Sequence, residues 1–212
     1  MKILFYGDSI TDMGRDTKIN FGTGYGVGYP NFIAGELLYE NPEKYSVINR
    51  GISGNRIVDL YARIKADVWN HQPDVISVLI GVNDVWHEID SNNGVELVRF
   101  EKIYRMMIEE TKTRLPNVKF ILCEPFVLKG EATVANFDRF SEVKEYAKVV
   151  EQIAKDYDCA FVPLQAKFDE KTAKYGVKPF LYDGVHPDTA GARLIANEWL
   201  KVFREKIDYK YD

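Results

Sequence analysis

The chain has 212 residues, of which 46% are hydrophobic and 28% are charged, and its formal net charge is −4. This length and balance suit a single globular domain over residues 1–212 and are unlike those of a disordered or membrane-spanning chain. An acidic chain lacks the positive field that attracts nucleic acid or an anionic bilayer, so we expect neither as a partner.

The sequence begins at Met1 and runs directly into an apolar segment that is too short for a secretory signal. No later stretch reaches the length needed to cross a bilayer, so we expect a cytoplasmic protein. The two cysteines, Cys123 and Cys159, lie in or beside apolar runs. We therefore interpret them as buried thiols and not as zinc ligands.

Five short apolar runs bounded by turn residues predict buried strands. In chain order they are Ile3–Tyr6, Ser46–Asn49, Val75–Ile80, Val118–Cys123 and Cys159–Val162. Amphipathic segments predict helices over Val58–Trp69, Leu97–Thr113, Phe137–Asp156 and Ala190–Phe203, the last capped by Asp188 or Thr189. This alternation predicts an α/β fold, a three-layer α/β/α sandwich with a central five-stranded parallel sheet.

Polar segments that contain glycine follow the first three predicted strands. They are Gly7–Ser9, Arg50–Asn55 and Gly81–Asp84. Because ligands bind beyond the carboxyl ends of the strands in such a sheet, we expect these segments to meet at one edge. Ser9 could there be a nucleophile, a hydroxyl of a phosphate-binding loop, or the cap of the next helix.

A serine becomes a strong nucleophile only when a base takes its proton, so Ser9 needs a histidine that a carboxylate orients. His71 precedes the third strand and lies at the wrong end of the sheet, whereas His87 lies on the expected edge and could line a cleft. His186 follows Asp183 by three residues, so the carboxylate can accept the Nδ1 hydrogen and leave Nε2 free. Taken alone, this spacing is a weak signal, because a surface histidine capped by a local aspartate has the same pattern.

The oxyanion of a tetrahedral intermediate needs hydrogen-bond donors. The candidates are the backbone N–H groups of Ser9 and Gly54 and the side-chain amide of Asn83. Each also has a simpler interpretation, because Gly54 can be a turn glycine and Asn83 can form an Asx turn.

Four blocks occur in order along the chain. They are Gly7-Asp8-Ser9-Ile10-Thr11, Gly51-Ile52-Ser53-Gly54-Asn55, Gly81-Val82-Asn83-Asp84 and Asp183-Gly184-Val185-His186-Pro187. With these blocks the sequence resembles the GDSL or SGNH hydrolase family, although Ile10 replaces the leucine of the family motif. The resemblance implies a flavodoxin-like SGNH hydrolase fold.

The same resemblance implies a role for each matching residue. Ser9 is the implied nucleophile, His186 the general base and Asp183 its orienting carboxylate, while Ser9, Gly54 and Asn83 form the oxyanion hole. We expect a serine esterase without a cofactor or a metal. A zinc helix is not expected either, because Ser91 stands where the segment that starts at His87 would need its second histidine.

Further residues resemble the intracellular acetylxylan esterase branch of this family. They are Asp12-Met13-Gly14-Arg15, Gly22-Thr23-Gly24-Tyr25 and Val85-Trp86. The branch implies deacetylation of xylo-oligosaccharides or other acetylated sugars, and a homo-oligomer in which residues 203–212 could pack on a neighbouring copy. Candidate substrate contacts near the expected edge are Tyr25, Trp86, His87 and Tyr182, since aromatic rings can stack on sugars.

Three alternatives remain open from the sequence. One is a thioesterase or lysophospholipase of the same family, which would keep the serine chemistry and change the ester. Another is a non-catalytic carbohydrate-binding protein with the same fold. The third is a flavodoxin-like protein that binds a flavin.

Overall fold

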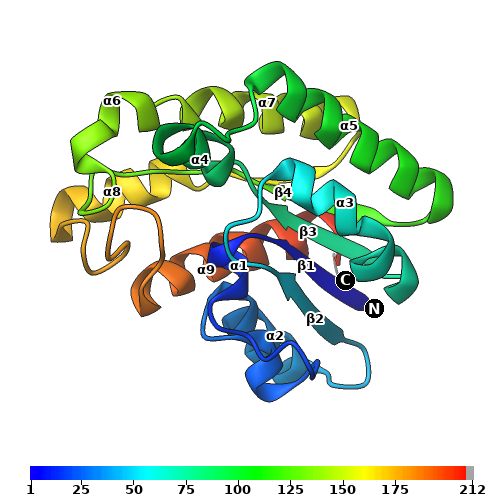
Figure 1. Cartoon of the computed structure of the whole chain (residues 1–212). Helices are drawn as coiled ribbons and strands as arrows, with labels where there is room; N and C mark the ends of the chain where they lie inside the picture. The colour runs from blue at the N-terminus through cyan, green and yellow to red at the C-terminus, as the bar shows by residue number, and fades with distance from the viewer. Residues whose placement is uncertain (209–212) are drawn as a thin grey trace.

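The computed structural model describes residues 1–208, so the last four residues of segment 203–212 lie outside the described part. Within it, five parallel strands form one sheet in the order β2-β1-β3-β4-β5 (Figure 1). The strands are β1 (Lys2–Gly7), β2 (Ser46–Gly51), β3 (Val75–Leu79), β4 (Lys119–Cys123) and β5 (Ala160–Val162). This is the flavodoxin-like order, and the predicted fold class and all five strands are confirmed.

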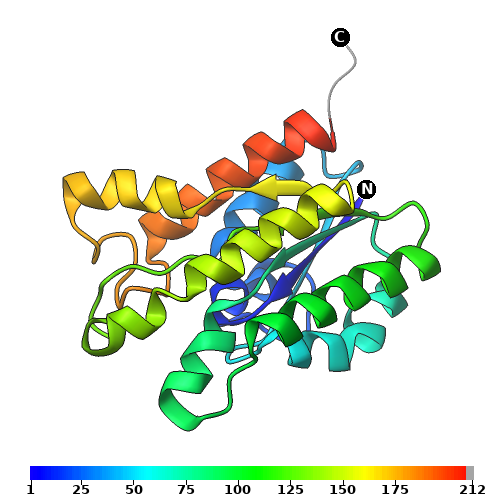
Figure 2. The same cartoon turned by 90° about the horizontal axis from the view of Figure 1, so that it is seen from above.

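Helices cover both faces of the sheet. They are α1 (Ser9–Asp12), α2 (Tyr29–Glu40), α3 (Ile57–Asp67), α4 (Val82–Ser91), α5 (Leu97–Arg114), α6 (Phe137–Phe140), α7 (Val143–Asp156), α8 (Gln165–Tyr175) and α9 (Thr189–Lys206), with short 3-10 turns η1 (Gly22–Tyr25), η2 (Trp69–His71) and η3 (Val134–Asn136). Helix α2 packs against α9 on one face, and α5 packs between α3 and α7 on the other. Figure 2 shows α9 and α5 on opposite sides of the sheet.

The four predicted helices are confirmed, with one interruption. The segment 137–156 divides into α6 and α7, because residues 141 and 142 form a turn between them. Helix α9 begins as predicted, since the Asp188 carboxylate accepts the Thr189 N–H at 2.5 Å. Helices α2, α4 and α8 were not predicted.

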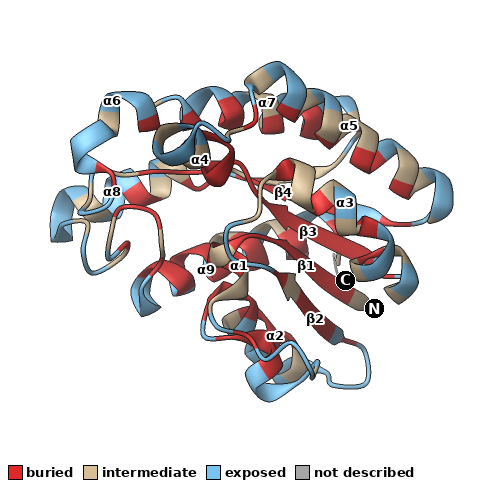
Figure 3. Ribbon diagram, in the orientation of Figure 1, coloured by how far each residue is buried: buried red, intermediate tan, exposed pale blue. Residues whose placement is uncertain are grey.

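The core lies between the sheet and the two helical layers (Figure 3), and the strands are buried on both faces. Trp199 of α9 is fully buried; its ring stacks on Phe203, and its Nε1 donates to the Ser77 hydroxyl of β3 at 2.9 Å. Both cysteines are free thiols, Cys123 buried and Cys159 half-buried. No helix within residues 1–208 is long and apolar enough to cross a bilayer.

Candidate active site

Ser9 lies on a tight connection between the end of β1 and the start of α1. Gly7 is required there, because a Cβ atom would lie 2.4 Å from the Thr11 hydroxyl and 2.5 Å from the Leu79 carbonyl. Asp8 caps the short helix by accepting the Ile10 N–H at 2.9 Å. This turn presents Ser9, half-buried, at the carboxyl edge of the sheet, where Figure 1 shows α1 at the end of β1.

His186 is held by a loop that Asp183 organises. One oxygen of the Asp183 carboxylate accepts the N–H groups of Val185 and His186, at 2.9 and 2.8 Å. The other oxygen lies 2.6 Å from Nδ1 of the His186 ring. Gly184 makes the turn possible, since its φ is +103° and a Cβ atom would lie 2.6 Å from the Leu128 carbonyl. One carboxylate therefore both shapes the loop and orients the imidazole.

Ser9 and His186 are 177 residues apart in the chain, yet the Ser9 Oγ lies 2.8 Å from His186 Nε2. Burial would raise the pKa of Asp183, but its hydrogen bonds to the imidazole and to backbone N–H groups hold that pKa below its usual value. Burial would likewise lower the pKa of His186, but Asp183 and, more weakly, Asp8 outweigh it and raise the pKa above 6.5. Asp183 is thus arranged to stabilise an imidazolium.

Two backbone donors and one amide lie in the same cleft as the Ser9 hydroxyl. Ser9, Gly54 and Asn83 line one cleft of about 290 Å³, and among residues 1–208 the N–H groups of Ser9 and Gly54 have no acceptor. Gly54 has a φ of +82°, which favours glycine. A Cβ atom added at Gly54 would have no atom of another segment within 4 Å among the described residues. The buried Asn83 amide is fixed beside this loop by donating to the Asn55 carbonyl at 3.1 Å. All three groups can donate to one oxyanion.

The loop that carries Gly54 is tied to α1 and to the residues that follow it. One oxygen of the Asp12 carboxylate accepts both the N–H and the hydroxyl of Ser53, at 3.0 and 2.8 Å. The buried Arg15 donates from Nε to the Gly51 carbonyl at 2.6 Å. Asp12 and Arg15 do not line the cleft, and they fix the loop next to the serine.

We expect Asp12→Ala to lower kcat by about 10- to 100-fold with little change in KM. The loop would keep its donor but hold it less firmly, and complete loss of one such donor costs on the order of 100- to 1,000-fold. Steady-state kinetics with phenyl acetate measures the effect. Asp16→Ala is the matched control, because within residues 1–208 the Asp16 carboxylate accepts a hydrogen bond from the local Lys18 N–H alone. An unchanged kcat in a folded Asp12 variant would contradict this role.

Two buried carboxyl groups that the sequence analysis did not single out support the same loops. Asp8 and Asp84 are 0% and 1% exposed; Asp84 accepts the Ile57 N–H at 3.0 Å and so joins the start of α3 to α4. The second oxygen of each has no hydrogen-bond partner within the described residues. Burial raises the pKa of Asp8 to about 7 and that of Asp84 to about 8. Their place in the first and third sequence blocks is the only signal that could have found them.

Trp86 and His87 line the cleft, as expected from their position after β3, and Asp90 joins them although the sequence did not indicate it. Tyr182 lies outside the cleft lining. The residue is 46% exposed, and its ring stacks on the His186 ring, with centroids 5.7 Å apart.

Tyr25 does not reach the cleft, so this candidate substrate contact is corrected. It is 8% exposed in η1, and its carbonyl accepts a hydrogen bond from the Asn49 side chain at 2.9 Å. The glycine-rich segment around Tyr25, residues 22–28, packs closely on α1. A Cβ atom at Gly26 would lie 2.4 Å from the Asp12 carbonyl. That packing buries Tyr25, which is not among the residues that line the cleft with Ser9. His71 lies outside the cleft as predicted, with Nε2 2.6 Å from the Arg50 guanidinium.

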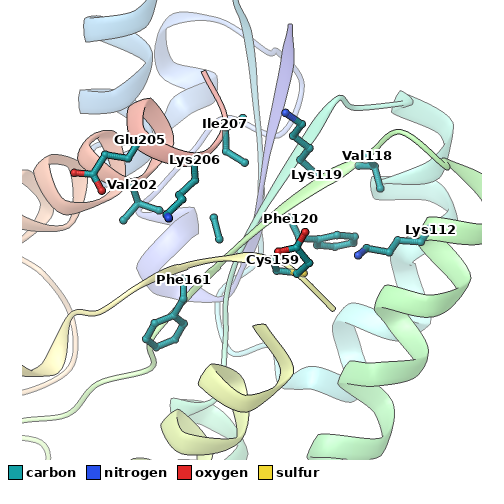
Figure 4. Close-up of a pocket in the computed structure, with 12 residues that line it drawn as sticks. Lys112, Val118, Lys119, Phe120, Cys159, Phe161, Val202, Glu205, Lys206 and Ile207 are labelled. Carbon is teal, nitrogen blue, oxygen red and sulfur yellow. The ribbon is translucent and has the colours of Figure 1, made fainter. Parts of the chain in front are cut away.

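A larger cavity of about 590 Å³ lies elsewhere (Figure 4). It opens between the end of α9 and the amino ends of β4 and β5, where Lys112, Lys119 and Lys206 surround an apolar floor that includes Phe120. Ser9, His186 and Asp183 lie at the opposite, carboxyl ends of the strands. Cavity size therefore does not mark the position of the serine and histidine pair.

Comparisons with known proteins agree over nearly the whole chain. Residues 5–194 match the model of the GDSL-like lipase/acylhydrolase family. The chain is 36% identical to an acetylxylan esterase from Geobacillus stearothermophilus, covering 94% of this chain and 92% of the relative. It is 26% identical to thioesterase 1/protease 1/lysophospholipase L1 of Escherichia coli, covering 78% of this chain and 71% of that protein.

Solved structures are also similar to this chain over most of its length. A protein from Parabacteroides merdae described as a GDSL-like lipase superposes with a TM-score of 0.89 at 38% identity, covering 95% of this chain and 94% of that one. The acetylxylan esterase of Geobacillus stearothermophilus superposes with a TM-score of 0.84 at 37% identity, covering 95% and 93%.

Proposed function

Because the chain belongs to the GDSL-like lipase/acylhydrolase family and is a carboxylic ester hydrolase, we propose that it removes acetyl groups from xylo-oligosaccharides or other acetylated sugars. The observation that carries the serine mechanism is the 2.8 Å contact between Ser9 Oγ and His186 Nε2, with Asp183 on the far side of the ring. The sugar substrate is supported by the similarity to an acetylxylan esterase.

In the first half of the reaction, the Ser9 oxygen attacks the carbonyl carbon of the ester while His186 Nε2 takes the hydroxyl proton. Asp183 stabilises the imidazolium that forms. The carbonyl oxygen becomes an oxyanion, which accepts hydrogen bonds from Ser9 N–H, Gly54 N–H and the Asn83 amide.

The tetrahedral intermediate then collapses, and His186 returns the proton to the departing alcohol. An acetyl group remains on Ser9. In the second half, His186 takes a proton from water, the resulting hydroxide attacks the acetyl carbon, and the same donors receive the second oxyanion. Acetate leaves when the proton returns to Ser9, which restores the enzyme.

The size of the cleft supports a short acyl group. Ligand pockets commonly measure about 300–1,000 Å³, and this cleft of about 290 Å³ must hold both the acyl group and part of the alcohol. Six of the eight residues that line the cleft have polar side chains, and Trp86 adds one large aromatic surface. A long alkyl chain could contact that ring but would meet no row of aliphatic side chains in this lining.

The proposal is tested by comparing two reactions of the protein. One is the release of acetate from acetylated xylo-oligosaccharides, and the other is the hydrolysis of octanoyl esters of the same alcohol. We expect kcat/KM to favour the acetyl ester by at least about 100-fold, since even one methylene can change it by about 10- to 200-fold. A preference for the octanoyl ester would instead favour the thioesterase or lysophospholipase alternative. No hydrolysis of either ester, with no labelling of Ser9 by a fluorophosphonate, would favour a non-catalytic carbohydrate-binding protein.

We also retain three broader features as proposals: a single domain, a cytoplasmic location and assembly into a homo-oligomer. One sheet with one continuous hydrophobic core supports the single domain. The resemblance to the acetylxylan esterase branch supports the oligomer.

A further inference from the structure

Helix α4 presents four cleft-lining residues on one face. Asn83, Trp86, His87 and Asp90 follow the spacing i, i+3, i+4, i+7, which places their side chains on one side of a helix. All four line the same cleft as Ser9 and His186. A single helix face therefore runs from the oxyanion donor out to the mouth of the cleft.

The length of this face decides which part of an ester Asp90 meets. Asn83 and Asp90 are separated by seven residues, or roughly 10 Å along the helix axis at about 1.5 Å per residue. An acetyl group whose carbonyl oxygen is bound at Asn83 is much shorter than that distance. Asp90 therefore faces the alcohol portion of an acetyl ester and not its acyl group.

The charge at this position is uncompensated. The exposed Asp90 carboxylate makes no hydrogen bond or ion pair within residues 1–208, and no lysine or arginine lines the cleft. A carboxylate accepts hydrogen bonds from hydroxyl groups and repels other anions. The outer end of the cleft thus suits a hydroxylated alcohol without negative charge.

Trp86 gives this end of the cleft a fixed aromatic wall. Its ring packs edge-on against Phe140, with centroids 5.4 Å apart, and lies 5.9 Å from the His186 ring. The ring is therefore held between α6 and the histidine loop. His87, one residue further along α4, adds a ring nitrogen that can donate to or accept from a hydroxyl group.

We propose that Trp86, His87 and Asp90 form a binding site for the neutral, polyhydroxylated alcohol of the ester, with Asp90 accepting hydrogen bonds from its hydroxyl groups. This inference rests on the proposed function and specifies how the sugar is recognised. It also predicts discrimination against leaving groups that carry phosphate or carboxylate, as the phosphate-bearing lipids and thioesters of the alternative function do.

Three acetyl esters test the site with four proteins, namely the parent, two Asp90 variants and one control variant. The esters are acetylated xylotriose, phenyl acetate and 4-acetoxybenzoate, the last differing from phenyl acetate by a carboxylate on the leaving group. For Asp90→Ala, we expect kcat/KM for xylotriose acetate relative to phenyl acetate to fall about 10- to 100-fold, mainly through KM, because a hydrogen bond to a charged acceptor is lost. For Asp90→Lys, we expect kcat/KM for 4-acetoxybenzoate relative to phenyl acetate to rise about tenfold.

Glu88→Gln is the matched control, because Glu88 lies on the same helix but does not line the cleft. Both substrate ratios should stay as in the parent protein. Unchanged ratios in the two Asp90 variants, with phenyl acetate still hydrolysed, would overturn the binding site and leave the esterase intact. Failure of the parent protein to hydrolyse phenyl acetate would instead overturn the proposed function itself.

Discussion

Ser9→Ala is expected to lower kcat for phenyl acetate by roughly 10⁴- to 10⁶-fold, the range seen when serine hydrolases lose their nucleophile. The Ser9 hydroxyl lies 2.8 Å from His186 Nε2, and within the described part of the chain no other cleft-lining hydroxyl bonds to that ring. Ser53, the other cleft-lining serine, donates its hydroxyl to Asp12. Among residues 1–208, the cleft lining therefore offers no second hydroxyl group in position to take over the attack.

The measurement combines kinetics with chemical labelling. A fluorophosphonate should modify the parent protein at Ser9, located by mass spectrometry, and should leave the alanine variant unmodified. Ser91→Ala provides the matched control, since the Ser91 hydroxyl donates to the His87 carbonyl on the exposed part of α4. Turnover at the parent rate in folded Ser9→Ala would exclude this residue as the nucleophile.

Asp183→Asn should lower kcat by about 10⁴-fold, the loss found when the same change is made in a serine protease triad. The Asp183 carboxylate accepts the Nδ1 hydrogen of His186 at 2.6 Å. An asparagine amide can instead donate to Nδ1, which favours the tautomer with its hydrogen on Nε2. That nitrogen could then no longer take the proton of Ser9.

The pH dependence provides a second readout for this variant. The base must be deprotonated, so kcat/KM of the parent should fall as pH drops through the His186 pKa, which lies above 6.5. Asp183 raises that pKa, so the inflection should move to lower pH in the variant. Asp188→Asn is the control, because Asp188 caps α9 and asparagine is also a good cap. An inflection at the same pH in both variants would contradict the role of Asp183.

The strands could be predicted because a parallel sheet buries both of its faces, which leaves continuous apolar runs such as Val75–Leu79. Helix α8 has no comparable signal, since Phe168 is its only buried residue. Helix α2 begins beside Pro30 and contains Gly35, and apolar residues on several sides leave no single stripe. These two helices depend on their surroundings more than on their local pattern.

Helix α4 was missed for a different reason, and the omission affected the site. Its first turn carries the polar residues Asn83 and Asp84, which the sequence presents as a loop, but both side chains are buried and bind other segments. Without that helix, the i+7 relation between Asn83 and Asp90 cannot be seen.

The order of four motifs sufficed to indicate Ser9, Asp183 and His186, whereas Tyr25 was misjudged because tertiary packing buries it.

The separation of 177 residues between Ser9 and His186 also has a consequence for synthesis on the ribosome. At about 5–20 residues per second, the serine is made roughly 10 to 35 s before the histidine. During that interval the nascent chain holds the proposed nucleophile and then gains the loops that carry Gly54 and Asn83, but it lacks the proposed base. Hydrolysis can begin only after the last loop has been translated and has docked, so an unfinished chain cannot cleave esters by this mechanism.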